Sequence, residues 1–447
     1  MGGPAAEQDG SAEAPTAVQT KNLKGNASMK KVTSALALAA LVGTPAAAMA
    51  NVEFGGDYDA SYFNVQNPNS RDTGVEQRIR LQSTFETDGG VEVHARLNLM
   101  NDRWTGDGSG NSSDLDEQPF TAPNRDHRNV ALDYGYVSLP TQIGRVNIGR
   151  QMANWNPSGL TTTDDRRDRI SLVMPLGGGH TMIPAFDVRG SGTTGNRTDD
   201  NYLGFVAFLG PLAEGVNYGL LLAQFETGSS GPTVIEGDPV PGSNYVLRGA
   251  TLISPYVQGQ FGDFNYEVGM HYLGDGRGWY TEDTFGGYVK GGFQMTPEFL
   301  LEGQVFHAAD GNLVAGGYDS FSSLINNSPD HDQSATSIPG LNLSGAVPAA
   351  APGTAGTEEQ DGMERTLVAV RGTYGMMDWT FKGAAGWVNY DDGDAGPRDE
   401  DVIFFDAQAH YALTPSTTVY GTAGFADSED YLGRDVFATS LNVNVQF

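Results

Sequence analysis

Hydrophobic and polar residues alternate along most of this chain in segments of about ten residues, the length of a tilted membrane strand. The clearest segment is Asp435–Phe447, where every second residue from Phe437 onward is apolar except Thr439, and the residues between them are small or polar. A period of two predicts a β-strand with one apolar and one polar face. Such a strand is a poor edge in a soluble sheet, but it suits a membrane barrel with lipid outside and water inside. Taken alone, the segment also fits an ordinary sandwich strand.

Two segments near the start of the pattern predict a β-hairpin. Val75–Phe85 and Val91–Met100 alternate strictly, and the residues Asp88-Gly89-Gly90 between them are typical of a tight turn. The polar face of this hairpin gathers four basic residues on two neighbouring strands: Arg78, Arg80, His94 and Arg96.

The same pattern continues to the end of the chain. The expected strands are 52–63, 75–85, 91–100, 129–139, 145–151, 202–208, 216–226, 245–260, 264–273, 285–295, 299–308, 364–374, 379–390, 402–413, 417–426 and 435–447. Short turns alternate with long loops rich in Gly, Ser, Asn, Asp and Pro. This alternation predicts an all-β fold, a transmembrane antiparallel up-and-down β-barrel of sixteen strands with short periplasmic turns and long extracellular loops.

The first fifty residues have a different character. Met29–Ala50 begins with Lys30 and Lys31, continues with an apolar run and ends in an A-x-A sequence, which is typical of a cleaved secretory signal peptide. The apolar run is too short for a membrane anchor helix. Residues 1–28 are expected to be an unstructured extension or to precede the natural start, and residues 51–447 to form the barrel.

Composition narrows the possible functions. The chain has no cysteine, which excludes disulfides and thiol chemistry. Its formal net charge of −29 disfavours nucleic acid as a partner, because the phosphate backbone would be repelled. No run of about 18 apolar residues follows the leader, so no transmembrane helix is expected. A sixteen-stranded barrel is too wide for its own side chains to fill, which predicts a water-filled channel.

Several features together resemble the general diffusion porins of Gram-negative outer membranes. These are the signal peptide, the strand pattern and the terminal Phe447, with two local matches: Gly144–Gln151, reading GRVNIGRQ, and Arg80-Leu81 in the second strand. The resemblance implies a passive channel for ions and small hydrophilic solutes, assembled as a homotrimer. It implies contact with outer-membrane lipid and lipopolysaccharide, and no cofactor. It also implies that the third long loop, Met152–Asn201, folds into the pore.

The resemblance makes Arg80 and Arg150 constriction residues. The full expected constriction set is Arg78, Arg80, Arg96, Arg150, Asp164, Asp165, Arg166, Arg167 and Asp168. The chain departs from the family in its loop, which lacks a P-E-F-G-G-D-like stretch and interleaves acids with arginines instead. The sign of the ion selectivity therefore stays open. Arg78 and Arg96 have two compatible interpretations. They can pair structurally with Glu76 and Glu92 across the hairpin, and they can guide solutes through the channel.

Arg150 conflicts with simple alternation. Its parity is that of Val146 and Ile148, which places it toward lipid, where an arginine costs about 2–4 kcal/mol at the midplane. A bulge at Gly149 would turn Arg150 inward, and this register break is expected. The alternative is that Arg150 lies at the polar rim of the barrel.

Other functions have weaker support. Calcium is conceivable in the acidic stretches Asp391–Asp401 and Asp102–Glu117, but neither has the full spacing of a calcium loop. The seven histidines are scattered and no G-x-S-x-G occurs, so no catalytic residues are expected. A substrate-specific channel for sugar, phosphate or another anion is the closer alternative. It would use a basic ladder and loop tryptophans, namely Arg78, Arg80, Arg96, Arg145, Arg150, Trp104, Trp155 and Trp279.

Overall fold

The computed structural model describes residues 51–67, 70–104, 130–153, 155, 166–190, 201–227, 234–235, 238–239, 251–274, 284–309, 321, 364–391, 399–427 and 435–447. The chain divides into two units, Met1–Ala50 and Asn51–Phe447, and every described residue belongs to the second. The signal peptide and the residues before it therefore lie outside the described residues and stay a prediction.

The described residues form strands and the turns between them. The strands are β1 (Asn51–Asn67), β2 (Ser70–Glu86), β3 (Glu92–Arg103), β4 (Ala131–Thr141), β5 (Gly144–Met152), β6 (Arg166–Gly177), β7 (His180–Gly190), β8 (Asn201–Ala213), β9 (Val216–Thr227), β10 (Val234–Ile235), β11 (Asp238–Pro239), β12 (Thr251–Phe261), β13 (Phe264–Gly274), β14 (Thr284–Thr296), β15 (Phe299–Ala308), β16 (Glu364–Met376), β17 (Trp379–Asp391), β18 (Asp399–Thr414), β19 (Thr417–Asp427) and β20 (Val436–Gln446). Within this part of the chain, no helix is long and apolar enough to cross a membrane.

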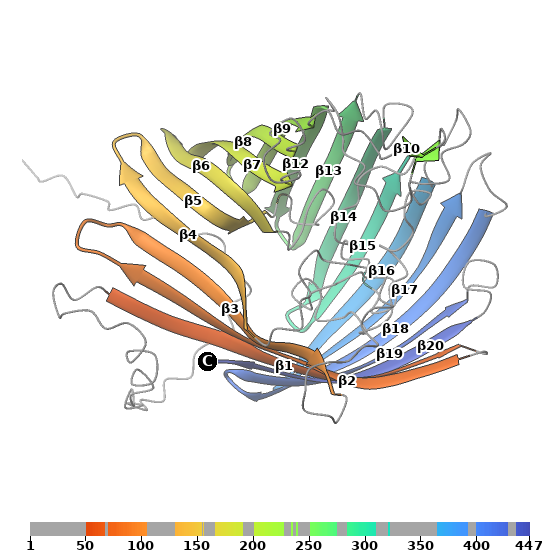
Figure 1. Ribbon diagram of the computed structural model, residues 1–447. Helices are drawn as coiled ribbons and strands as arrows, with labels where there is room; N and C mark the ends of the chain where they lie inside the picture. Colours follow the sequence, from red (N-terminus) through yellow and green to blue (C-terminus); the bar gives the residue numbers. More distant parts are fainter. Residues whose placement is uncertain are drawn as a thin grey trace, which may run out of the picture. The chain divides into compact units, whose positions relative to one another are not determined.

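Eighteen strands form one closed antiparallel barrel. Each strand pairs with its neighbour along the chain, β9 pairs with β12 across the small β10–β11 hairpin, and β1 pairs with β20 to close the ring. Figure 1 shows the barrel strands following one another in chain order from β1 to β9 and from β12 to β20, with β10 apart from the ring. The expected barrel class and all sixteen expected strands are confirmed, but the count of sixteen is wrong.

The two additional strands lie inside the segment expected to be one inward loop. Residues Met152–Asn201 contain the hairpin β6–β7, which turns at Gly178-Gly179. The backbone of the turn has positive φ at Gly177, Gly178 and Gly179, a conformation that glycine adopts readily. The predicted third loop is therefore shorter, covering 153–165 between β5 and β6.

The two faces of the strands follow the predicted alternation. On β20 the side chains of Phe437 and Leu441 are exposed on the outside, as is Phe447 after the strand, whereas Ser440 and Asn442 are buried on the lumen side. This division places apolar residues toward lipid and polar residues toward the channel, as the sequence pattern predicts.

The seam between β1 and β20 is tightly fitted at Gly56. The backbone N–H of Gly56 donates to the Phe447 carbonyl at 2.8 Å, and the Phe447 N–H donates to the Gly56 carbonyl at 3.0 Å. A Cβ atom at Gly56 would lie 2.6 Å from Cζ of the Phe447 ring, closer than real side chains approach. The ring of Phe447 thus uses the space that a side chain at residue 56 would take.

We expect Gly56→Ala to destabilise the closed barrel, because the new methyl group would clash with the Arg80 carbonyl oxygen on β2 and would displace either that backbone or the Phe447 ring. The loss should be about 1–3 kcal/mol, the usual cost of overpacking. The measurement is gel electrophoresis of unboiled samples that have been warmed to increasing temperatures. It gives the temperature at which the protein no longer migrates as the compact, folded barrel. Gly55→Ala is the matched control, since its Cβ would meet only a carbonyl oxygen at 3.4 Å. Equal melting of the two variants would contradict this packing argument.

Candidate functional site

Acid–arginine pairs cross the lumen face of the first two strands. The register of β1 and β2 places Asp57 opposite Arg80 and Asp59 opposite Arg78. Arg80 Nε donates to both carboxylate oxygens of Asp57 at 3.0 Å, and Arg78 Nη2 donates to Asp59 at 2.8 Å. All four residues alternate with exposed apolar residues such as Phe54, so the pairs face the channel.

A β-bulge turns a further acid toward the same side. The register of β3 with β4 shifts from Arg96 opposite Tyr134 to Leu97 opposite Leu132, which leaves Asp133 as the extra residue. Leu132 stays exposed on the outside, whereas the side chain of Asp133 is only 6% exposed. Bulges commonly change the direction of a side chain in this way.

Asp133 accepts hydrogen bonds from arginines on two different strands. Arg96 Nε on β3 donates to Oδ2, and Arg166 Nε at the start of β6 donates to Oδ1 at 2.6 Å. The sulfur of Met152 lies 3.7 Å from Arg96 Nη2. Charge-assisted bonds of this kind are the stronger class of hydrogen bond, so Asp133 fixes the position of both guanidinium groups.

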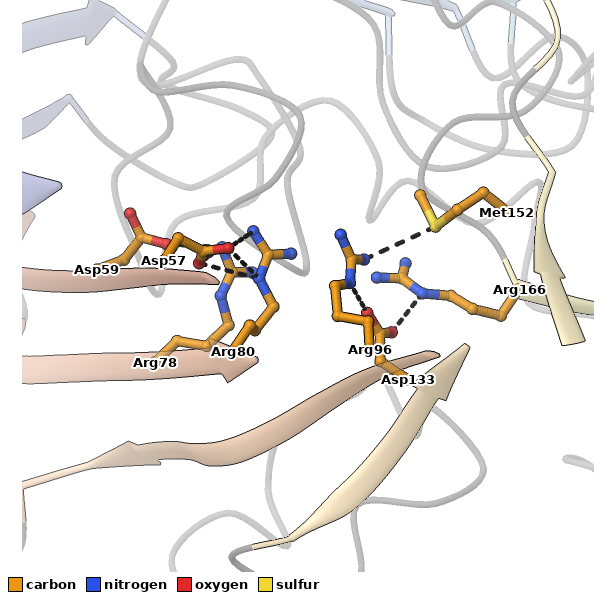
Figure 2. A network of polar contacts seen from close by, with 8 residues as sticks. All are labelled: Asp57, Asp59, Arg78, Arg80, Arg96, Asp133, Met152 and Arg166. Carbon is orange, nitrogen blue, oxygen red and sulfur yellow. Dashed lines mark hydrogen bonds and ion pairs between the residues drawn. The ribbon is translucent and has the colours of Figure 1, made fainter. Parts of the chain in front are cut away.

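Figure 2 shows these eight residues as two groups of contacts. The register of β2 with β3 places Arg80 opposite Asn98 and Gln82 opposite Arg96, so Arg80 and Arg96 are diagonal neighbours on one face. We call the eight residues the lumen network: Asp57, Asp59, Arg78, Arg80, Arg96, Asp133, Met152 and Arg166. Four arginines and three aspartates give the network an excess of one positive charge at neutral pH.

The charged wall continues along the neighbouring strands. Arg169 on β6 forms a two-pronged pair with Asp187 on β7, with Nε to Oδ1 at 2.6 Å and Nη2 to Oδ2 at 2.8 Å. Toward the short turns, Arg145 Nη2 lies 2.7 Å from Glu92 Oε1. The other carboxylate oxygen, Glu92 Oε2, lies 3.0 Å from His94 Nε2. The lumen face from β1 to β7 is therefore lined by ion pairs.

The structure sorts the predicted constriction residues into three groups. Arg78, Arg80, Arg96 and Arg166 belong to the lumen network, and Arg167 lies beside them on β6. Arg78 is paired with Asp59, and Arg96 with Asp133, on neighbouring strands, where Glu76 and Glu92 were the expected partners. Asp164 and Asp165 lie outside the described residues.

Arg150 and Asp168 form the third group, on the outer face. The registers of β5 with β4 and β6 are continuous through residue 149, so the expected break at Gly149 is wrong. Ile148 pairs with Ile170 and Arg150 pairs with Asp168, on the face where Ile148 and Ile170 are exposed outside. Met152 and Arg166 have the same parity but reach the lumen network; they lie beyond Arg150, where β4 no longer pairs with β5. The Arg150 and Asp168 side chains are 37% and 57% exposed and bonded to each other at 2.9 Å. Unbroken strand alternation keeps Arg150 on this face, and Asp168 balances its charge there.

An aromatic residue from the connection after β5 contacts β12, which is not a neighbour of β5 in the ring. Trp155 Nε1 donates to the carbonyl and the hydroxyl of Ser254 on β12, at 3.1 and 3.0 Å. Its ring packs edge-on against Tyr256 at 5.6 Å between centroids. Because β5 and β12 are separated by four strands of the ring, the chain at Trp155 lies inside the barrel.

The remaining candidate chemistry is not gathered into a site. Most of the two acidic stretches considered for calcium lies outside the described residues. Among the residues that the structure describes, no three His, Asp or Glu side chains are grouped so that they could hold a metal ion. This geometry holds fixed charges in place along a water-filled passage. These charges act on the ions and solutes inside it.

Comparisons with known proteins agree with this architecture. The sequence model of a protein family described as Gram-negative porin matches residues 37–431. Two Pseudomonas aeruginosa structures are similar in fold: OpdK with vanillate (12% identity, TM-score 0.55, 89% of this chain and 98% of that chain) and OccK3, also called OpdO (11%, 0.52, 89% and 96%). An anion-selective porin from Comamonas acidovorans also matches (12%, 0.44, 89% and 100%). No curated protein matches this sequence.

Proposed function

Since this chain belongs to the Gram-negative porin family, and is thus a passive channel of the outer membrane, we propose that its lumen network selects among the ions and small hydrophilic solutes that pass. The family and the fold are those of channel proteins. The observation that carries the proposal is the row of arginines held in place by aspartates on one wall of a wide barrel. Fixed charges on a pore wall act directly on passing ions.

The test is a single-channel recording of the refolded mature chain in a planar bilayer under a salt gradient. We expect a steady, ohmic conductance and a small reversal potential of the anion-selective sign, because the lumen network carries one excess positive charge. Absence of conductance from protein that is folded by circular dichroism would refute the channel. A cation-selective potential would refute the assignment of selectivity to this network.

A substrate-specific anion channel is the second candidate function. It is favoured by the continuation of the arginine row from the lumen network to Arg145 and Arg169, which provides several successive contacts for an anionic solute. The probes are inorganic phosphate and vanillate, the latter because OpdK, a channel of similar fold, has been solved with vanillate. Block of the current at micromolar concentration would support specificity, whereas an unblocked current would leave only general diffusion.

We also propose a homotrimer whose subunits meet over the outer face of β5 and β6, with lipid and lipopolysaccharide against the rest of the apolar outside. The observation is the Arg150–Asp168 pair on that face. Charged groups facing hydrocarbon cost about 2–4 kcal/mol for an arginine at the midplane, and a second protein copy can supply polar partners instead. The occupant we assign to this face is therefore a second copy of this chain.

Replacing both charges, Arg150→Leu with Asp168→Leu, tests this assignment. At a subunit interface, the double variant should dissociate to monomers at a lower temperature than the original, by about 2–4 °C if roughly 1 kcal/mol is lost per subunit. Substituting the neighbouring pair, Ile148→Leu with Ile170→Leu, is the matched control. A double variant that is unchanged or more stable would place the pair against lipid.

We propose further that Met29–Ala50 is a signal peptide and that residues 1–28 are absent from the exported protein. The support is the sequence of a positive start, a short apolar run and Ala48-Met49-Ala50. Sequencing the amino terminus of protein purified from outer membranes should yield Asn51 first. Any other first residue would move or remove the proposed cleavage site.

A further inference from the structure

Large apolar side chains are exposed at one short turn after another, from the β6–β7 turn to the β18–β19 turn. Each of them lies in the last residues of a strand or directly after it, and each is more than half exposed. Single exposed apolar residues are common on protein surfaces, but a position that is apolar at every turn in succession is a pattern. We call these residues the apolar rim: Leu176, Leu212, Phe261, Met295, Met377 and Leu413.

Most residues of the apolar rim are the extra residues of β-bulges. The pairing registers of β6, β8, β14 and β18 each shift just before the turn. The residue left between the shifted pairs is Leu176, Leu212, Met295 or Leu413. Bulges set the direction of the extra side chain. The same local structure thus recurs with the same kind of side chain.

Met377 reaches an exposed position by a different route. Its side chain is 95% exposed and its backbone has φ +53°, in the left-handed region. Other short turns place Gly90, Gly215 and Gly262 in this region. Glycine adopts the conformation freely, whereas a side chain with a Cβ atom is strained there. The β16–β17 turn therefore holds a large apolar side chain where glycine would be the easier residue.

The apolar rim continues the outer face of the strands. On β14 the exposed residues Phe285, Val289 and Phe293 alternate along the outside, and Met295 continues their row to the turn. The distance along the barrel axis from Phe285 to Met295 is about 25 Å at the usual strand tilt, which is the height of the apolar belt of a membrane barrel. The belt on this strand therefore ends at the short turn itself.

The opposite end of the outer face is polar. Asp401 on β18 and Asp427 on β19 are exposed near the long connections, and they have the outward parity of Ile403 and Phe425 on the same strands. A charged side chain that faces hydrocarbon is unfavourable, so the apolar belt stops before these aspartates. The belt thus extends from there to the short turns and has no polar border at the turn end.

The charges of the short turns argue against anionic head groups as the main contact. These turns contain acidic residues, among them Asp263, Glu298 and Asp378, but no lysine or arginine. Attraction to anionic lipids requires basic residues near the membrane surface. The apolar rim is therefore suited to contact with the acyl chains of lipids, whatever the charge of their head groups.

We propose that the apolar rim inserts into the adjacent lipid leaflet of the outer membrane, so that the short turns lie at the lipid surface and not in the water beyond it. The occupant of this surface is the phospholipid of the bilayer that the barrel spans, because the rim is continuous with the lipid-facing belt. This inference goes beyond the proposed selectivity and does not depend on the lumen network. The channel mouth at this end is thereby held level with the membrane surface.

The experiment measures the depth of the short turns in vesicles. The chain has no cysteine, so one introduced cysteine is a unique site for a nitroxide spin label. The variants Phe261→Cys and Met377→Cys of the mature chain are labelled and reconstituted in phosphatidylcholine vesicles; both residues lie away from the subunit face proposed on β5 and β6. Collisions of the label are measured with oxygen, which dissolves in lipid, and with a nickel chelate, which stays in water.

Gly89→Cys is the matched control. It lies in the turn between β2 and β3, where Thr87-Asp88-Gly89-Gly90 contains no apolar side chain, and a Cβ atom at Gly89 would meet only Thr87 Oγ1 at 3.9 Å. The ratio of oxygen to nickel collisions at residues 261 and 377 should be several-fold higher than at residue 89. Vesicles with added phosphatidylglycerol should give the same ratios, because no basic residue of the turns contacts the head groups.

A second label position keeps the apolar side chain in place. In Asp378→Cys the label is next to the intact Met377, and adding Met377→Ser should lower its oxygen-to-nickel ratio toward that of residue 89. A ratio that does not respond to Met377→Ser would overturn the insertion of this side chain. Should Phe261→Cys not fold, Leu212→Cys takes its place.

The remaining outcomes separate this inference from the channel function. If the labels at residues 261 and 377 give the same ratio as residue 89 in vesicles that conduct ions, the insertion is refuted and the channel function stands. High ratios that appear only with phosphatidylglycerol would refute contact with acyl chains as the cause. Folded protein that shows high ratios but no conductance would refute the channel function and leave the insertion in place.

Discussion

Asp133→Ala is expected to make the channel more anion-selective and the barrel less stable. The substitution removes the one acid that Arg96 and Arg166 share, so the excess positive charge of the lumen network rises from one to two. A unit charge about 5 Å from a passing ion changes its energy by about 0.8 kcal/mol in water, which is about fourfold in local concentration. Anions are enriched and cations depleted by about that factor, so we expect the anion-to-cation permeability ratio to rise by at least about fourfold in dilute salt.

The stability effect of Asp133→Ala has a separate cause. Removing one partner of a buried ion pair leaves the other charges uncompensated, which costs about 3–5 kcal/mol in a dry interior and less beside a wet lumen. Asp133→Glu is the control because it keeps the charge on a longer side chain, and its permeability ratio should stay near that of the original. If the alanine variant is folded and its reversal potential is unchanged, Asp133 does not contribute to selectivity.

The double variant Arg78→Gln with Arg80→Gln should have the opposite effect and a larger one. It leaves Asp57 and Asp59 facing the lumen without the two arginines that lie across the register. The local charge then falls by two units, enough for about a tenfold change in favour of cations at low ionic strength. We expect the reversal potential to change sign.

Two further variants identify the cause of that change. Adding Asp57→Asn and Asp59→Asn to the double variant returns the network to an excess of one positive charge, so the anion-selective reversal potential should be restored. Replacing both arginines with lysine keeps the charge but loses the planar two-pronged geometry, and should preserve anion preference. If the Arg78→Gln with Arg80→Gln variant stays anion-selective, other arginines, such as Arg169, determine the ion selectivity of the channel.

The strand pattern was readable in the sequence because lipid outside and water inside impose one rule on every strand. The hairpin β6–β7 obeys that rule only in part: Ile170 and Leu172 alternate with Arg169 and Ser171, but Val173 and Ile183 place apolar residues on the other parity. It was missed because the charged stretch before it and the glycines within it resemble a loop. The family resemblance, which implied a pore loop there, reinforced the error.

The lumen network was only half predictable. Alternation within each strand assigns Arg78, Arg80 and Arg96 to the polar face. It gives the same face to Asp57 and Asp59 of the first strand, although these two were not among the predicted constriction residues. Which acid meets which arginine depends on the register between strands, and a single-strand pattern does not contain that information. Asp133 needed the bulge in β4, and Arg150 shows the converse, because unbroken alternation keeps it outside and Asp168 balances its charge.

The seam between β1 and β20 has a consequence for how the protein is made. β1 is synthesised before every other strand of the ring, and β20, its partner at Gln66 and Phe437, after all of them. A nascent chain that stops short of β20 presents two unpaired strand edges, whose amide groups find no partners in hydrocarbon. Insertion is thereby tied to complete translation. A prematurely terminated product therefore stays in the aqueous compartment, where proteases can reach it, and does not form an open pore in the membrane.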